Sequence, residues 1–585
     1  MKFAEFAEYL NKIEKIASRL EMTNVLAELF KKAEPSEIDK ICYLSLGILA
    51  PKYEGIELNL AEKMMLRALA QVLNLPILQI QQKFKEVGDL GEAFFLLNHL
   101  KEIRLHASLQ INEVYESLIK IAKDSGFGSQ ERKINKIVEL LKNLDCLSVK
   151  FIVRIAVQKL RLGFSEMTIL DALSWTALGD KSLRPNLEQA FNVRADIGQI
   201  AQIFKQAGIA AIDKVIPQIG KPIRPAKATP LLDKQEILDK MEGRAFLEPK
   251  YDGFRVQLHF DKQQKNENQE ESLALFAKEE KAFVRIFSRN LDNITHMFPE
   301  LVEACQKLPV ESVILDGEAV AIDPKTGKLL DFQETVKRKR KHNVQKVSED
   351  IPLKAFIFDC LYLNGENLLT KSFSQRRDIL NKLFVNFQNP HMEETVQQKV
   401  DNVVDLENFF QQVAGKGLEG LMAKKIDAVY KAGARDFTWV KYKVGMQQEM
   451  ADTVDAVVMG YFKGQGKWAK FGLGKVLVGI LDKEKIIAVS KLGSGLSEEK
   501  IIEMKKQCDR WQTAEMPVNY QVDKNLFPDV WVAPKIVIEI RADSISKSPL
   551  YQAGLSLRFP RFIKFRPDKN LEDATNLQQL QNMSL

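Results

Sequence analysis

The first 215 residues repeat apolar positions at the spacing of an α-helix. One such stripe contains Val114, Leu118, Ile121 and Ala122, and another contains Ile134, Ile137, Val138 and Leu141. Residues three and four positions apart share one face of a helix, so each stripe must pack against a partner. The segment 1–215 is therefore predicted to form an all-α domain.

The segment between these two predicted helices, 123–130, contains Gly126 and Gly128. Glycine frees the backbone there, and Ser129 can cap a helix that begins at Gln130. Free N–H groups at a helix N-terminus can bind a phosphate. A plain turn between two helices explains the same residues, so both interpretations stay open.

A proline-rich segment, 217–230, ends the helical region and is predicted to be a linker, because proline excludes a helix or a central strand. Strand-like and helix-like stretches then alternate to about residue 440, which predicts an α+β core over 216–443. Within this core, the polar insert 262–281 is predicted to be an extended hairpin loop or a partly disordered insert.

After residue 444 the pattern changes to short apolar runs separated by turns. Strands are predicted at 455–461, 476–481 and 486–492, and a helix from Ser497 to about Trp511. Several short strands with one helix are typical of an OB-fold β-barrel, which is predicted over 444–585. The chain is thus expected to be a multidomain protein.

Composition changes this picture little. The chain has 585 residues, a formal charge of +7 and five scattered cysteines without a C-x-x-C pair. The charge permits nucleic-acid binding, and the cysteine pattern argues against a zinc site or a disulfide framework. The N-terminal segment does not resemble a signal peptide, and no apolar run is long enough to span a membrane. A cytoplasmic protein, associated with the nucleoid in a prokaryote, is expected.

The candidate chemistry centres on Lys250, in the stretch FLEPKYDGFRVQLHF (246–260). Arg255 to Phe260 alternate between apolar and polar residues, which predicts a half-buried strand, and Asp252-Gly253 predicts a tight turn before it. Most lysines beside a turn are surface residues. A lysine that attacks a phosphate must be neutral, which requires burial or nearby cations.

A second cluster of charge lies at 418–443. Trp439 to Lys443 alternate, so Lys441 and Lys443 are predicted to share one strand face. Two lysines there repel each other unless an anion such as a triphosphate lies between them. Glu318 follows a buried apolar run, where a carboxylate is uncommon without a metal or ribose partner.

The order K-Y-D-G-F-R at Lys250 resembles the K-x-D-G-x-R motif of the covalent nucleotidyltransferases, which include DNA ligases, RNA ligases and capping enzymes. The strings GFGSQERKI, LRLGFSEMTILDAL, GKPIRP and LRFPRFIKFRPDK resemble those of the larger ATP-dependent DNA ligases. The resemblance covers nearly the whole chain. It implies a helical DNA-binding domain, an ATP-grasp-like adenylation core and a C-terminal OB-fold barrel.

The resemblance also implies a role for each matched residue. Lys250 would be the nucleophile. ATP would be bound by Glu248, at the adenine amino group, and by Arg255, Arg289, Glu318, Phe358, Arg435, Lys441 and Lys443. Glu318 and Glu419 would hold a metal, and Arg566 and Lys569 would orient the pyrophosphate leaving group. DNA would be contacted by Gly126, Gly128, Ser129, Lys150, Arg154 and Arg161, although a row of basic residues is more often a solvated helix face.

The implied activity is that of an ATP-dependent DNA ligase that seals nicks in double-stranded DNA through a lysyl-AMP intermediate, during replication, repair and recombination. ATP is the expected co-substrate, Mg²⁺ the expected cofactor with Mn²⁺ as an alternative, and nicked DNA the expected partner of a monomer. No sliding-clamp motif stands out, so a clamp partner stays open. An RNA ligase or capping-type enzyme, and a non-catalytic DNA-end scaffold, are the alternatives.

Overall fold

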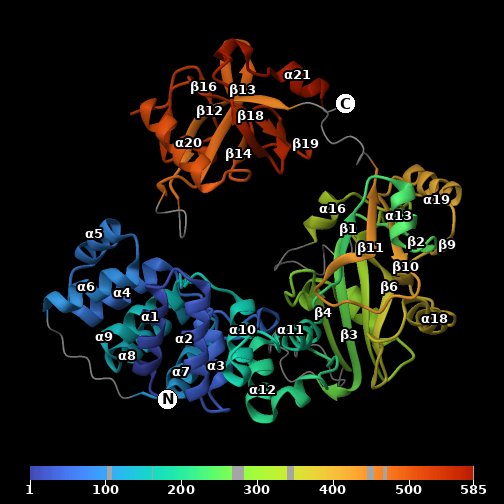
Figure 1. Ribbon diagram of the computed structural model, residues 1–585, viewed down its shortest axis with the longest axis horizontal. Coiled ribbons are helices and arrows are strands. Elements are labelled where there is room, and N and C mark those ends of the chain that lie inside the picture. The colour runs from blue at the N-terminus through green and yellow to red at the C-terminus, as the bar shows by residue number, and fades with distance from the viewer. Residues whose placement is uncertain are drawn as a thin grey trace. The chain divides into compact units, whose positions relative to one another are not determined.

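The computed structural model describes residues 1–101, 109–160, 162–265, 282–338, 348, 350–444, 453–464 and 471–583 (Figure 1). The chain divides into two compact units, Met1–Lys443 and Val444–Leu585, and each is described by itself. In the described part of the chain, no helix has both the length and the apolar character that a membrane crossing requires.

The predicted helical domain is confirmed. Its helices are α1 (Phe3–Glu14), α2 (Arg19–Lys32), α3 (Ile38–Ser45), α4 (Glu62–Leu73), α5 (Ile77–Val87), α6 (Leu90–Lys101), α7 (Ile111–Lys123), α8 (Ser129–Lys142), α9 (Cys146–Ala156), α10 (Glu166–Leu178), α11 (Arg184–Val193) and α12 (Ile197–Ile212). The apolar stripes predicted on α7 and α8 are buried in a single core shared by these helices. Asp145 and Asp196 cap α9 and α12 by accepting backbone N–H groups.

The start of α8 differs from the expectation. The helix begins at Ser129 itself, its N-cap is Gly128 in a left-handed conformation with φ of 73°, and no side chain caps it. Ser129 is therefore not the cap. Arg132 orders the preceding loop by donating hydrogen bonds to the carbonyl oxygens of Ser125 and Phe127, at 3.0 and 2.7 Å.

The α+β core contains two sheets. The first has the strand order β1-β11-β10-β2-β9 and the second the order β4-β3-β5-β6-β7, with β8 paired to β6. The first sheet contains β1 (Lys227–Pro230), β2 (Ala245–Lys250), β9 (Gln398–Val400), β10 (Gly420–Lys425) and β11 (Arg435–Lys443). The second contains β3 (Phe254–Lys265), β4 (Ala282–Ser288), β5 (Ser312–Ala321), β6 (Leu353–Leu363), β7 (Glu366–Asn367) and β8 (Met392–Glu394).

Helices cover one face of each sheet. α13 (Lys234–Lys240) and α19 (Val403–Gly415) pack on the first sheet, and α15 (Pro299–Gln306) and α18 (Phe373–Phe384) pack on the second. α16 (Phe332–Lys337) lies against β5. A small apolar cluster that includes Ile314, Leu361, Tyr430 and Trp439 joins the two sheets. The predicted insert falls mostly on 266–281, outside the described residues.

The proline-rich segment is more firmly held than a linker needs to be. Gly220 donates its N–H to His259 Nδ1 at 3.1 Å, and Gln257 bonds both the N–H and the carbonyl of Ile223, at 2.8 and 3.1 Å. The segment then becomes the edge strand β1. The polar face of β3 is consequently buried as well, with Gln257 4% and His259 0% exposed.

The second unit is rich in strands. Its main sheet has the order β15-β17-β12-β13-β14-β16, with β18 joining β12 to β21. These strands are β12 (Val454–Phe462), β13 (Lys475–Asp482), β14 (Lys485–Leu492), β15 (Gln512–Thr513), β16 (Tyr520–Gln521), β17 (Val530–Val532), β18 (Val537–Arg541) and β21 (Arg561–Phe565). The predicted helix is α20 (Glu498–Arg510), and β19 (Ser544–Lys547) pairs separately with β20 (Leu555–Arg558). α21 (Leu577–Asn582) lies near the C-terminus. A β-rich second unit is confirmed, whereas a closed OB barrel stays a prediction.

Candidate active site

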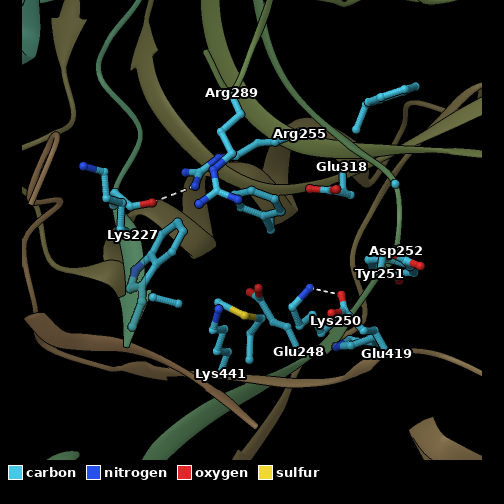
Figure 2. A pocket seen from close by; sticks show the side chains of 18 of the residues that line it. Lys227, Glu248, Lys250, Tyr251, Asp252, Arg255, Arg289, Glu318, Glu419 and Lys441 are labelled. Atoms are coloured by element: carbon cyan, nitrogen blue, oxygen red, sulfur yellow. Dashed lines mark hydrogen bonds and ion pairs between the residues drawn. The ribbon is translucent and has the colours of Figure 1, made fainter. Parts of the chain in front are cut away.

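A cavity of about 490 Å³ lies between the two sheets of the core and is lined by residues from both. Figure 2 shows Arg255, Arg289 and Glu318 on one side, facing Glu248, Lys250 and Lys441 on the other. The lining also includes Phe358, Glu419, Arg435 and Lys443. All the residues of the core that the sequence assigns to ATP or metal thus meet in one cavity.

Lys250 ends β2 instead of lying on the loop that follows it. β2 pairs with β10, and the N–H of Glu419 donates to the Lys250 carbonyl at 3.1 Å. This pairing holds the two side chains together, and Lys250 Nζ donates to Glu419 (Figure 2). Lys443 Nζ forms an ion pair with the same carboxylate.

Two of the carboxylates at the cavity, Glu318 and Glu419, have opposite pKa shifts. Burial pushes the pKa of Glu419 upward, but the charges and hydrogen bonds of Lys250 and Lys443 outweigh it and hold the pKa below its usual value. Burial raises the pKa of Glu318 to about 7, against the opposing charges of Lys250 and Arg255. Within the described residues, the Glu318 side chain makes no hydrogen bond or ion pair.

Several cations line the cavity without a counter-ion in the described part of the chain. Among the residues that the structure describes, the side chains of Arg289, Arg435 and Lys441 form no hydrogen bond or ion pair. Burial lowers the pKa of Lys441, and the charges of Lys443, Lys250 and Arg435 lower it further. Such a concentration of like charge costs stability and attracts a polyanion.

Two carboxylates and several cations fit a metal–polyphosphate complex. No group of three or more His, Cys, Asp or Glu side chains that could hold a metal occurs in the described ranges. Mg²⁺ is usually held by one or two carboxylates together with waters and substrate phosphates. Glu318 and Glu419 therefore suit a cation that arrives with a phosphate ligand.

Arg255 is more constrained than its predicted ribose or phosphate contact suggests. Its guanidinium forms two hydrogen bonds with Asp316, at 3.0 and 2.6 Å, and donates to the carbonyl of Ala226 at 2.6 Å. Tyr430 also donates to Asp316, at 3.0 Å. No local pattern in the sequence predicts these partners, because Asp316 and Tyr430 lie 61 and 175 residues away from Arg255.

The predicted leaving-group residues lie in the second unit. Arg566 Nη1 and Lys569 Nζ form ion pairs with the two oxygens of Asp455, at 3.1 and 2.6 Å. Arg566 also contacts Asp568 at 2.7 Å. Their role in pyrophosphate release stays a prediction.

The predicted DNA-contacting residues have mixed surroundings. Gly126 and Gly128 lie in the loop before α8, next to Phe127, whose side chain is fully exposed. Lys150 and Arg154 are buried on α9, where Glu14, Asp89 and Glu92 neutralise them. Arg161 lies outside the described residues. DNA binding by these residues stays a prediction.

The two-sheet core and its cavity define a class of protein that binds a polyphosphate beside a lysine. Family models agree along the chain: residues 2–174 match the DNA ligase N terminus, 275–443 the ATP dependent DNA ligase domain, and 469–569 the ATP dependent DNA ligase C terminal region. The chain belongs to the ATP-dependent DNA ligase family, and this predicted membership is confirmed.

Similar proteins cover the full length. A probable DNA ligase of Dictyoglomus turgidum is 41% identical over 596 residues, spanning 100% of this chain and 97% of that protein. The DNA ligase of Sulfophobococcus zilligii is 38% identical, spanning 98% of this chain and 95% of that protein. A solved structure named Pmar-Lig_Pre. is similar in fold, with a TM-score of 0.55, 17% identity, and coverage of 96% of this chain and 99% of that one.

Proposed function

We propose that this ligase carries the adenylyl group on Lys250 Nζ and transfers it to the 5′-phosphate of a nick in duplex DNA. The observation that supports this most is the cavity itself, which Lys250 lines together with Glu318, Glu419 and several cations that have no counter-ion among the described residues. A triphosphate supplies the negative charge that these cations lack.

In the first step the neutral amine of Lys250 attacks the α-phosphate of ATP. A bond forms between Nζ and phosphorus, the bond from phosphorus to the bridging oxygen breaks, and pyrophosphate leaves. The proton lost from Nζ passes to water, which reaches Lys250 because its side chain is 20% exposed. Lys441 and Arg435 stabilise the phosphoryl oxygens in the transition state through their charge.

A divalent cation, proposed to be Mg²⁺ with Mn²⁺ as an alternative, would be held by Glu318 and Glu419 and would neutralise charge on the phosphates. Arg566 and Lys569 are proposed to meet the pyrophosphate during this step. AMP then passes to the 5′-phosphate of the nick. This second step breaks the bond between Nζ and phosphorus and returns Lys250 to its free form. In the last step the 3′-hydroxyl attacks the 5′-phosphate and displaces AMP, which joins the strand.

The test is a labelling experiment with the full chain. Incubation with α-labelled ATP and Mg²⁺, followed by denaturation and peptide mapping, is expected to place one adenylate on Lys250. Lys250→Ala should abolish the label and retain duplex binding, while the control Lys399→Ala, an exposed lysine on β9, should label normally. A label on another residue, or one that persists in Lys250→Ala, contradicts the proposal. A sealing assay that compares nicked DNA with nicked RNA then shows which nucleic acid is the substrate.

A further inference from the structure

One ammonium group is enclosed behind the nucleotide cavity and has no role in the steps above. Lys424 lies on β10, its side chain is 1% exposed, and it contributes to the cavity lining. Its Nζ lies 2.6 Å from Glu248 Oε2 and donates to the carbonyl of Phe358 at 3.3 Å. A charge buried this deeply is rare without a specific partner.

The surroundings of Lys424 occupy all of its donors. Nζ lies 4.3, 4.5 and 4.6 Å from the ring centroids of Trp439, Phe358 and Phe373. An ammonium has three N–H groups, and here two point to oxygen atoms while the remaining one meets aromatic rings. Burial lowers the pKa of Lys424, and the charge of Glu248 opposes that effect. Lys424 therefore has no donor left for a nucleobase.

Glu248, by contrast, has acceptor capacity left. Its side chain is 2% exposed and its carboxylate points into the cavity (Figure 2). Besides Lys424, it accepts a hydrogen bond from Gln397 Nε2 at 3.2 Å, and Arg377 Nη1 lies 3.8 Å away. Two carboxylate oxygens offer about four lone-pair sites. Glu248 can therefore accept a further N–H, and it has no proton to donate as long as it is ionised.

We propose that Lys424 is a positioning residue for base selection: it holds the Glu248 carboxylate in place as an acceptor, so that the cavity accepts a purine with a 6-amino group and rejects one with a 6-oxo group. This inference rests on the proposed function, because it concerns the nucleotide that Lys250 attacks. A 6-amino group donates to the carboxylate. A 6-oxo group instead brings a second acceptor toward it, and two acceptors repel without a proton between them.

Removal of the lysine gives this inference a specific consequence. Without Lys424 the buried carboxylate keeps only Arg377, 3.8 Å away, and the hydrogen bond from Gln397. Glu248 is then no longer held with an acceptor aimed at a 6-amino group, so the difference between the bases becomes smaller. Lys424→Met keeps the length of the side chain and removes its charge, so it should change which base is accepted without touching the phosphates.

The experiment measures formation of the lysyl-nucleotide on the full chain with ATP, GTP and purine riboside triphosphate, which lacks the 6-amino group. Lys424→Met is expected to lower the preference for ATP over both analogues by about 10- to 100-fold. The loss should be a rise in the KM for ATP, with the saturating rate close to that of wild type. The neighbouring Lys425→Met serves as control, since Lys425 pairs with Glu242 on the surface, and its preference should not change.

A second variant keeps the test decisive if Lys424→Met folds poorly. Glu248→Gln removes the carboxylate that Lys424 pairs with. In a Glu248→Gln background, Lys424→Met should therefore change the base preference little further. The double variant should also unfold at a higher temperature than either single variant. Unchanged preferences in Lys424→Met, or additive effects in the double variant, overturn the inference. Adenylate on Lys250 of the wild type in the same assay shows that the proposed function itself still holds.

Discussion

Basic side chains have opposite surroundings in the two halves of the first unit. In the helical domain, Arg154 is 9% exposed and has contacts to Glu14, Asp89 and Glu92 at 2.7 to 3.7 Å. Around the cavity of the core, Arg289, Arg435 and Lys441 have no such partner in the described ranges. The same residue types are neutralised in one region and unopposed in the other.

This difference separates structural charge from functional charge. A cation that is paired and buried contributes to folding, and its loss leaves acids without a partner. A group of unpaired cations opposes folding, and such conflicts concentrate at functional sites. The position of the counter-ions, more than the number of basic residues, therefore tells which region handles a polyanion.

The largest expected effect comes from a cavity cation. Lys441→Ala should slow formation of the lysyl-adenylate by about 10²- to 10³-fold, because it removes a preorganised charge at the phosphates. Its thermal unfolding temperature should stay the same or rise, since a repulsive charge is lost. Single-turnover labelling and thermal unfolding measure the two quantities, with Lys399→Ala as the exposed control. A strongly destabilised Lys441→Ala variant would mean that Lys441 stabilises the fold, as the paired cations do.

Arg566, in the second unit, is a cation that has acidic partners and is also expected to act in catalysis. Arg566→Ala should slow self-adenylation by about 10²-fold, because a cation at the leaving group acts in that step. Sealing of a pre-adenylated nick should change far less. The control is Arg561→Ala, an arginine of β21 that pairs with Asp543. Equal losses in the two assays would count against a leaving-group role.

A smaller effect is expected from a paired cation. Arg154→Ala should lower the free energy of unfolding by about 2 kcal/mol, because it leaves Asp89 without its ion-pair partner and Glu14 with Lys150 alone. Adenylation below the unfolding temperature should be unchanged. Denaturant unfolding measures the first quantity, and Lys159→Ala, an exposed pair with Glu62, is the control.

The same variant also tests the role in DNA binding that the sequence suggests. A residue that contacts a phosphate contributes about one unit to the slope of binding against salt concentration. If Arg154→Ala reduces that slope and leaves stability intact, Arg154 belongs with the DNA contacts and the contrast between the two regions fails.

The sequence predicted much of this fold because its signals are local. Helical spacing identified the α7 and α8 stripes, and short apolar runs identified β12, β13 and β14. The motif around Lys250 and the isolated Glu318 indicated a shared pocket, and both line the same cavity.

What the sequence could not supply are contacts between distant segments. Glu419 is 169 residues from Lys250, and Glu14 is 140 residues from Arg154. Local pattern places a basic residue on a helix face, but it does not say whether an acid lies opposite. The enclosed position of Lys424 was missed for the same reason, since three aromatic rings from three segments surround it.

β3 gives the clearest case of a contact that the sequence did not predict, and its effect is expected on stability alone. Alternation predicts that His259 faces solvent, yet the proline-rich segment covers it. Burial and the charge of Arg285 lower the pKa of His259 to about 3. The unfolded chain binds a proton near the ordinary value of about 6.5, so this contribution to stability is complete above that pH and is lost as pH falls toward 3.

His259 is thus a third case, a buried basic side chain that stays neutral in the folded protein. Wild type should lose about 2 kcal/mol of unfolding free energy from this group between pH 7 and pH 5. His259→Gln should be less stable at pH 7, because it loses the fitted contacts to Gly220 and Gln257, and its stability should depend less on pH over this range. Denaturant unfolding at a series of pH values measures both, with the exposed His296→Gln as control. Parallel pH curves for wild type and His259→Gln would mean that the segment opens and lets His259 take up its proton in the folded protein.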